Sequence, residues 1–391
     1  MHHTLGGLNR GSNLVKLSNY LVKDFLTTFS MAMLLITFAF SVGAIYKAVD
    51  IMAKGFPVDV VARFFVYNLP YSVAYTIPVS ALFSTLLLFG RLSSDSELSA
   101  MKGGGLSIRQ IASPIVLLSF VLMLFCFWNN FSIYPQTTYY NRQLIKSLGV
   151  EDPIKLLEEG RFVRDFPGWV IYVGKKSSNQ VEDVIAYQVD EDTGKVQMSL
   201  RADRGTLTVD QKNSIIDAEL EGCRMEVPDP EGAGELGEIG ITPSSERIKN
   251  IRLNFKELLQ QEKKIHPKRK NMTFSELMYR VRNPEQGYSW LPSENWSKER
   301  TRDLVEVNQR ICLSIAPFMF VLIAIPLGIR SHRKESSAGM LISLAVLFVY
   351  YIFIILSDTF QGSPVLRPWL WPWIPIIGGQ IAAFVLTRRA E

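Results

Sequence analysis

The sequence has few of the residues from which enzyme centres and disulfide frameworks are built. It contains three cysteines and four histidines in 391 residues. Cys126 and Cys312 fall in long apolar segments, which leaves Cys223 alone in the polar part of the chain, so no disulfide framework is available. The histidines are scattered among tails and polar loops, at His2, His3, His266 and His332. This scatter favours neither a metal centre nor a Ser-His-acid arrangement.

A nucleotide-binding loop is also missing, because the pattern G-x-x-x-x-G-K-[ST] does not occur in the sequence. We therefore predict that the chain is not an enzyme and has no catalytic residues, no metal, no cofactor and no nucleic-acid partner. If the protein uses ATP, a partner subunit has to bind and hydrolyse it.

Charge is missing from six long segments, although 20% of all residues are charged and 48% are hydrophobic. A helix needs about 20 apolar residues to cross the hydrocarbon core of a bilayer, and one charge at its centre costs about 3 kcal/mol. Each segment therefore predicts a membrane-spanning helix. The six are Phe25 to Tyr46, Phe64 to Gly90, Ile111 to Pro135, Ile311 to Ile329, Ala338 to Ser357 and Trp369 to Thr387.

The basic residues beside these segments predict the orientation of the chain. They collect on one side, which by the positive-inside rule is the cytoplasm and holds both termini. The segment 136–310 then lies outside, which in a bacterium is the periplasm. The basic residues are Arg10, Lys16, Lys23, Arg91, Lys102, Arg109, Arg330, Arg333, Lys334, Arg388 and Arg389.

Between residues 160 and 228 the period of the apolar residues changes from helical to alternating. Such alternation, interrupted by turn residues, is typical of antiparallel strands in a sandwich or jelly roll. A last strand is expected at 248–255, after a loop rich in Pro, Gly and Glu at 228–240. The expected turns are Asp192 to Gly194, Asp203 to Gly205 and Asp210 to Asn213.

These patterns predict an α-helical membrane protein with six transmembrane helices and an inserted periplasmic all-β, jellyroll-like domain. A capping box at Thr273 and Glu276 opens a short helix before the fourth span. The expected divisions are transmembrane helices 1–3 at 1–135, with a cytoplasmic helix at about 91–105, the β-domain at 136–262, a linker and entry to helix 4 at 263–310, and helices 4–6 at 311–391.

The loop after the second span, Gly90 to Met101, is the first motif. A short amphipathic helix held between two spans can pass a rigid-body push from a partner into the membrane, and Glu97 can pair with a basic group of that partner. The run Gly103-Gly104-Gly105 favours a sharp end to this helix. The spacing of Ser94 and Glu97 equally fits a capping box, in which Glu97 only satisfies backbone donors.

The second motif follows the first span, where Lys47, Asp50 and Lys54 are spaced to share one face of a continuing helix. A cation partly withdrawn from water beside the hydrocarbon can hold a phosphate. The alternative is a snorkelling lysine that pairs with Asp50. Phosphate binding is favoured for Lys47 and pairing for Lys54.

The third motif, Glu306 to Ile311, enters the fourth span, which ends in Ala324-Ile325-Pro326-Leu327-Gly328. Glu306 and Arg310 form an i, i+4 pair suited to an exposed helix start. We expect this pair to anchor the helix rather than to bind a ligand.

Together, the loop around Glu97, the segment from Gly43 to Asp50 and the entry at Glu306 resemble the LptF/LptG family of lipopolysaccharide export permeases. The resemblance covers nearly the whole chain in order: three spans, an external β-jellyroll and three spans. It implies the transmembrane subunit of an ABC-type exporter that extracts lipopolysaccharide from the bacterial inner membrane and passes it to a periplasmic β-jellyroll bridge. The Lys47 to Asp50 segment favours an LptG-like over an LptF-like subunit without deciding between them.

The resemblance also implies partners and residue roles. The first motif looks like the coupling helix that sits in a groove of the ATPase LptB, with Ser94, Asp95, Glu97, Leu98 and Met101 as the coupling residues. Lys47 and Lys54 are implied to contact the phosphates of the lipid. Besides an LptB-like ATPase, the implied partners are a second six-helix permease subunit, a single-span LptC-like jellyroll protein and an LptA-like bridge protein.

Two other classes of protein stay open. A secondary transporter would show paired charges or broken helices at mid-membrane, for which Pro70 and Pro78 are the hint. A membrane receptor with a periplasmic sensor domain would need a cytoplasmic output domain, and the inner loops are too short to form one.

Overall fold

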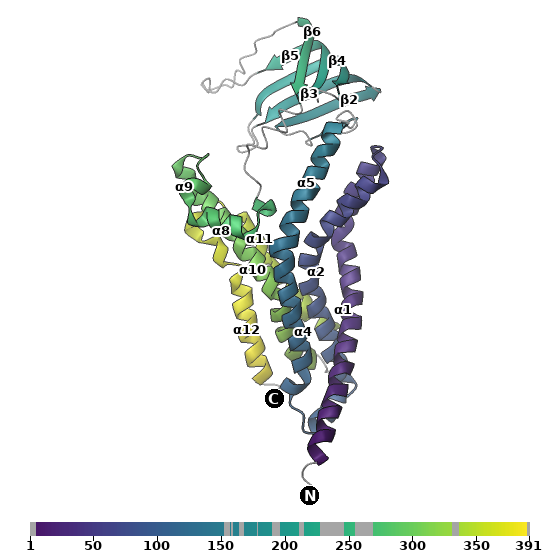
Figure 1. Cartoon of the computed structure of the whole chain (residues 1–391), viewed down its shortest axis with the longest axis vertical. Coiled ribbons are helices and arrows are strands. Elements are labelled where there is room, and N and C mark those ends of the chain that lie inside the picture. The colour runs from purple at the N-terminus through teal and green to yellow at the C-terminus, as the bar shows by residue number, and fades with distance from the viewer. Residues whose placement is uncertain are drawn as a thin grey trace. The chain divides into compact units, whose positions relative to one another are not determined.

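The computed structural model describes residues 5–151, 157, 159–163, 168–177, 179–189, 196–210, 215–226, 246–254, 269–330 and 336–388. The chain divides into two compact units (Figure 1). Unit 1 is helical and comprises residues 1–47, 65–139 and 268–391. Unit 2 comprises residues 48–64 and 140–267 and contains the β-sheet.

Each of the six apolar segments falls in helical structure. Four described helices are long and apolar enough to cross a membrane, and a bent pair at 364–388 makes a fifth if it counts as one span. The described apolar part of the helix at 336–359 is shorter, so the full count of six remains a prediction. The α-helices that contain the apolar segments are α1 (Leu5–Ala53), α2 (Val58–Ser94), α4 (Ile108–Trp128), α5 (Tyr134–Glu151), α10 (Ser293–Arg330), α11 (Ser336–Thr359) and α12 (Trp373–Arg388).

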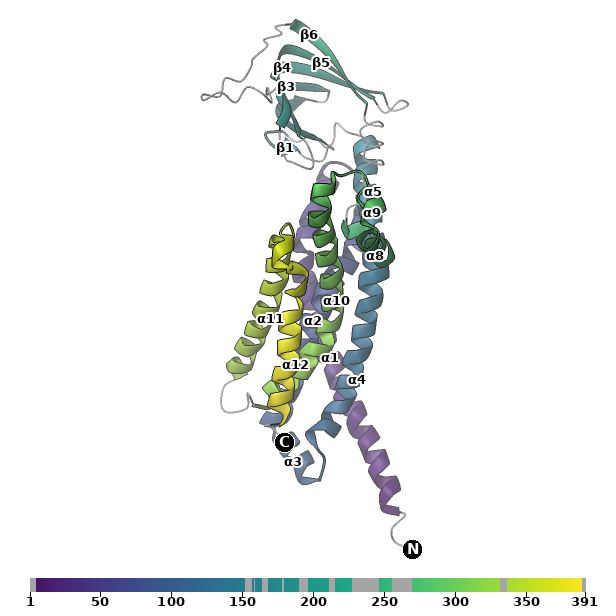
Figure 2. The ribbon, with the colours of Figure 1, turned by 90° about the vertical axis from the view of Figure 1, so that its left-hand side faces the viewer.

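Helices α2 and α10 form the centre of unit 1, because their apolar stretches are mostly buried whereas those of α1 and α4 are mostly exposed. Helix α10 lies between α4 on one side and α11 and α12 on the other (Figure 2). Glycine permits the close crossings: a Cβ at Gly328 of α10 would lie 2.9 Å from Cβ of Phe89 on α2. Small residues at such crossings are typical of membrane helices.

The start of α1 and the end of α12 lie at the same end of unit 1 (Figure 2). That both termini lie on the cytoplasmic side of the membrane remains a prediction.

A π-helical turn, η1 (Asn129–Ile133), joins α4 to α5 and places two buried amides between helices. Asn129 Nδ2 donates to the Pro70 carbonyl of α2 at 3.1 Å, and Asn130 Nδ2 donates to Ser314 Oγ of α10 at 2.9 Å. Amide side chains that hydrogen-bond across helices are typical of packed membrane helices. Pro70 takes part through its own carbonyl in the contact between α2 and η1.

The described strands of unit 2 form one six-stranded antiparallel sheet in chain order. They are β1 (Phe162–Val163), β2 (Trp169–Ser177), β3 (Gln180–Val189), β4 (Val196–Asp210), β5 (Ile215–Glu226) and β6 (Glu246–Asn254). This confirms an antiparallel β insertion and the last expected strand. A jelly roll combines two Greek keys, and the described strands alone form a meander.

The prediction of a turn at Asp203 to Gly205 is wrong, because these residues lie inside β4. There Arg204 is in register with Glu182 of β3 and Glu221 of β5. Glycine marks close contact here instead of a turn: a Cβ at Gly205 would lie 2.6 Å from Leu220 Cδ2. The turn at 192–194, residues 211–213, the loop at 228–240 and the four histidines lie outside the described residues.

Unit 1 also contains a short helical segment before α10. It comprises the 3-10 turn η2 (Arg269–Asn271), α8 (Phe274–Arg282) and α9 (Pro284–Gly287). The capping box at Thr273 and Glu276 is confirmed, with both of its hydrogen bonds formed at the start of α8.

Candidate functional site

Between α2 and α4 lies the short helix α3 (Glu97–Gly103). Its N-cap is Ser96, whose φ of 59° is left-handed and whose side chain makes no capping hydrogen bond. Ser94 Oγ instead donates to the Arg91 carbonyl at 2.9 Å. The capping-box interpretation of Ser94 and Glu97 is therefore wrong, and the Glu97 carboxylate is not occupied by a capping role.

The glycine run ends α3 sharply, as expected. Gly105 has φ +85°, the Leu106 N–H donates to the Met101 carbonyl at 3.2 Å, and the Gly105 N–H donates to the Lys102 carbonyl at 3.0 Å. This pair of hydrogen bonds around a left-handed glycine is the Schellman ending of a helix. The direction of the chain after α3 is thereby fixed.

Apolar packing attaches α3 to the helix bundle. Leu98 is buried in the core that includes Leu21 and Phe25 of α1, and Met101 packs against the same core. In the last turn of α2, just before α3, Ser93 Oγ donates to the Ile329 carbonyl of α10 at 3.1 Å. Leu98 and Met101 therefore hold the helix in place. Ser94 and Asp95 are exposed and Glu97 is half-buried.

A polar network connects Glu97 to α1 and α2. Arg91 makes two hydrogen bonds to the Asp24 carboxylate, at 2.6 and 3.2 Å. Arg91 Nη2 also donates to the Tyr20 hydroxyl at 3.2 Å, and Tyr20 donates to Glu97 Oε2 at 3.5 Å. A displacement of α3 would therefore act on both helices.

The two candidate lipid-contacting lysines differ in their surroundings. Lys47 is exposed on α1. Lys54 follows the end of that helix, its side chain is only 10% exposed, and its Nζ lies 3.0 Å from Asp50 Oδ2. The structure thus contains the pairing with Asp50 that the sequence favours for Lys54.

A cavity of about 490 Å³ lies inside unit 1, among α1, α2, η1, α5, η2, α10 and α11. Its wall combines aromatic rings with charged and amide groups. The aromatic residues are Phe40, Tyr71, Tyr75, Tyr134 and Tyr351, and the polar ones include Lys270, Glu306, Gln309, Arg310 and Asp358. Such a wall can hold the polar end of an amphiphile by hydrogen bonds and ring contacts.

Arg310 lies at the wall of this cavity and is only 3% exposed. Its Nε donates to Glu306 at 2.9 Å, and its two terminal nitrogens donate to the carbonyls of η2 and Met272 at 2.8 to 3.2 Å. The guanidinium also lies 5.5 Å from the centre of the Tyr134 ring. The ion pair expected between Arg310 and Glu306 is confirmed. The prediction that this pair lies at an exposed helix start is wrong, because Arg310 is buried and α10 begins at Ser293.

Sequence reasoning missed most of this cavity. Tyr351 donates to the Tyr75 carbonyl at 3.2 Å, which joins α11 to α2 across the cavity wall. Arg310 was the one signal in the sequence that pointed to a buried polar site. An arginine directly before an uncharged span costs free energy unless it is paired.

A second buried cluster surrounds Asp303 of α10, whose side chain is fully buried. Its carboxylate accepts from Arg269 Nε at 2.9 Å and from the Tyr288 hydroxyl at 2.8 Å. Arg280 Nε lies 3.3 Å away, and the guanidinium lies 5.0 and 4.9 Å from the ring centres of Tyr288 and Trp290. Burial, together with Asp303, raises the pKa of Tyr288, so the phenol stays a donor at neutral pH.

The family model described as lipopolysaccharide export system permease LptF/LptG matches residues 19–389. The chain belongs to the LptF/LptG family. It is 20% identical over 329 residues to the lipopolysaccharide export system permease protein LptF of Escherichia coli K12 and to that of Shigella flexneri, covering 81% of this chain and 79% of each relative.

Membership in the LptF/LptG family confirms the resemblance, and with the apolar helices it makes the chain a multi-pass permease of the inner membrane. A member of this family is a component of a transporter rather than an enzyme. Membership favours the permease over the secondary transporter and the receptor. Both relatives are LptF proteins, so they give no support to the LptG-like preference for the Lys47 to Asp50 segment.

Proposed function

We propose that this chain is the transmembrane subunit of an ABC-type lipopolysaccharide exporter and that a separate, LptB-like ATPase drives it by docking on α3. The observation that supports this most directly is the attachment of α3. The helix is short and part of it is accessible. Its Glu97 accepts from Tyr20 of α1, and Tyr20 accepts from Arg91 of α2. Directly before α3, Ser93 of α2 donates to the Ile329 carbonyl of α10.

The same three helices contribute to the polar cavity. Phe40 comes from α1, Tyr71 and Tyr75 from α2, and Glu306 and Arg310 from α10. A rigid-body movement of α3 would therefore change the cavity wall. In this proposal Ser94, Asp95 and Glu97 contact the ATPase, while Leu98 and Met101 transmit its movement into the bundle.

Exposed surfaces support the other proposed partners. Large apolar side chains are exposed along α1 and α11, including Leu34, Phe38, Leu344 and Phe348, and they suit a second six-helix permease subunit. Among the described strands β6 forms one edge of the sheet. An exposed edge can add a strand from another protein, which suits hand-over of the lipid through LptC-like and LptA-like jellyroll proteins in the periplasm.

Charge reversal at Glu97 tests the coupling step. Because a like charge would face the basic group of the ATPase groove, we expect Glu97→Lys to lower the amount of ATPase that co-purifies with the chain by about tenfold. Glu97→Gln should lower it by at most about fivefold, the range of an exposed ion pair. The measurement is the ratio of ATPase to permease after purification from native membranes.

Glu294→Lys is the matched control, because Glu294 is an exposed acidic residue in the first turn of α10. It should leave the ratio unchanged. Equal recovery of ATPase with Glu97→Lys and the wild type would contradict the proposed role of Glu97. Purification of the wild type without any ATPase or second permease subunit would contradict the proposed function as a whole.

Lys47 is proposed as the principal contact for lipid phosphates, with Lys54 second because it pairs with Asp50. Each basic residue near an anionic headgroup contributes about 1 kcal/mol. Lys47→Gln should therefore lower the lipopolysaccharide retained by the purified chain about fivefold, and Lys54→Gln should lower it less. A larger effect of Lys54→Gln in a stably folded protein would reverse this assignment.

A further inference from the structure

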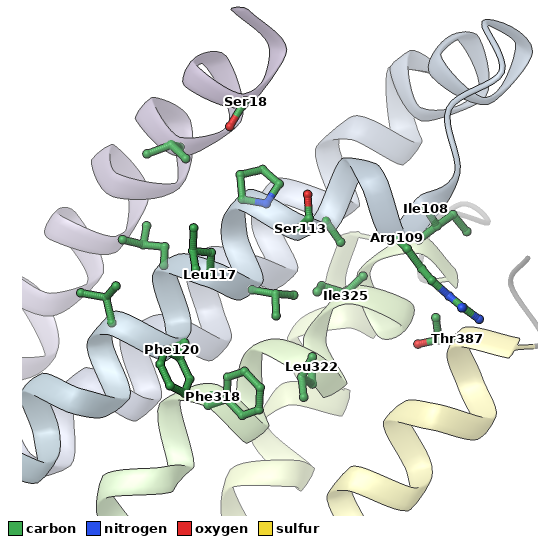
Figure 3. Close-up of a pocket in the computed structure, with 16 residues that line it drawn as sticks. Ser18, Ile108, Arg109, Ser113, Leu117, Phe120, Phe318, Leu322, Ile325 and Thr387 are labelled. Atoms are coloured by element: carbon green, nitrogen blue, oxygen red, sulfur yellow. The ribbon is translucent and has the colours of Figure 1, made fainter. Parts of the chain in front are cut away.

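A second cavity of unit 1, of about 980 Å³, is a mostly apolar groove between α1, α4, α10 and α12 (Figure 3). Its walls are built largely from aliphatic and aromatic side chains, among them Val22, Ile108, Leu117, Phe120, Leu322 and Ile325. It shares no residue with the polar cavity that contains Arg310.

The groove has one polar end and one apolar end. Arg109 and Thr387 lie together at one end, and Phe120 and Phe318 lie at the other (Figure 3). The two phenylalanine rings meet edge to face, with 6.2 Å between their centres. A ligand that follows this groove therefore meets a cation at one end and a ring pair at the other.

The length of the groove matches one leaflet of a bilayer. From Arg109 to Val121 the helix α4 rises by about 18 Å. Half of the hydrocarbon core is about 15 Å thick. An acyl chain fits this length, whereas a membrane-spanning helix of another subunit needs about 30 Å.

The end of the groove at Arg109 and Thr387 favours a ligand group with a negative charge. Arg109 is exposed in the first turn of α4, and that turn contains no acidic residue. The capping box of Ser107 and Gln110 opens the helix at this position, so its positive dipole end lies beside the guanidinium. Ser113 and Thr387 also line the groove, and their hydroxyls donate to the carbonyls of Gln110 and Ala383.

We propose that this groove binds an anionic phospholipid of the leaflet next to α3, with its headgroup at Arg109 and one acyl chain along α4. This lipid is not the exported substrate, and its groove is separate from the polar cavity. It would fill the space between α1, which α3 contacts through Glu97, and α10, and so keep these two helices at a fixed separation.

Lipids bound to the purified full chain test the proposal. The chain is exchanged into nanodiscs of phosphatidylcholine with a minority of phosphatidylglycerol, released into mild detergent, and the retained lipids are measured by mass spectrometry. Arg109→Gln should lower retained phosphatidylglycerol about fivefold, the factor that one arginine near an anionic headgroup contributes. Leu117→Trp should lower both lipids, because the indole fills the groove.

Two matched controls use exposed residues outside the groove. Lys16→Gln removes an exposed cation of α1, and Leu124→Trp adds the same ring to an exposed position on α4. Both should leave retention unchanged. Equal retention by Arg109→Gln and the wild type, or loss of a co-purifying membrane subunit with Leu117→Trp while phosphatidylglycerol stays, would overturn the proposal. Lipopolysaccharide as the retained lipid of protein from native membranes would also overturn it.

Discussion

Replacing Arg310 with methionine is expected to destabilise unit 1 by about 3–5 kcal/mol, the usual cost of removing one partner from a buried ion pair. The methionine keeps an unbranched apolar stem but is shorter than arginine and donates no hydrogen bond. Glu306, which is 15% exposed, would lose its counter-charge. The carbonyls of Met272, Arg269 and Lys270 would lose their donors.

Thermal unfolding of the purified protein in detergent measures this loss. Arg302→Met is the matched control, because Arg302 is also on α10 and also pairs with a glutamate, Glu299, but is 40% exposed. That substitution should cost at most about 1 kcal/mol. Adding Glu306→Gln to Arg310→Met should recover part of the loss. Equal unfolding temperatures for the two arginine variants would show that the buried ion pair of Arg310 stabilises the protein no more than the exposed pair of Arg302.

Arg310 also lies at the wall of the polar cavity, so its replacement should affect function as well as stability. Its guanidinium holds η2, the first described turn after the sheet, against the start of the apolar part of α10 and beside Tyr134. All of these groups belong to unit 1 and border the polar cavity. Release of η2 should therefore change the cavity wall as well as the stability.

The sequence predicted the helices well because their signal is local. An uncharged run of about 20 residues can be recognised without knowing its neighbours, and helical structure lies over all six runs. The Schellman ending of α3 and the capping box of α8 depend on a few adjacent residues in the same way. Where the local pattern was ambiguous, as at Ser94 and Glu97, the wider packing decided it.

The rest of the site depends on contacts between distant residues. Arg310 is buried because carbonyls 38 to 41 residues earlier in the chain fold onto it. Asp203 to Gly205 forms strand because β3 and β5 pair with it on both sides. No spacing within either segment carries that information, so an exposed pair and a turn were the natural expectations.

The second large effect is expected at Asp303. Asp303→Asn keeps the shape of the side chain but removes the negative charge that faces Arg269 and Arg280. Arg280 is 9% exposed and Asp303 is fully buried, so water cannot replace the lost charge. We expect a loss of about 3–5 kcal/mol, concentrated in the contact between α8 and α10.

Tyr288→Phe separates charge from hydrogen bonding in this cluster. It removes the 2.8 Å hydrogen bond to Asp303 but leaves both arginines and the aromatic ring beside Arg280 in place. A hydrogen bond to a charged group contributes about 1.5–3 kcal/mol, so this variant should lose less stability than Asp303→Asn. Limited proteolysis at α8 and α9 reports the same difference locally, since only Asp303→Asn should expose them to cleavage. Similar destabilisation by both substitutions would mean that the hydrogen bond, and not the buried charge, holds α8 against α10.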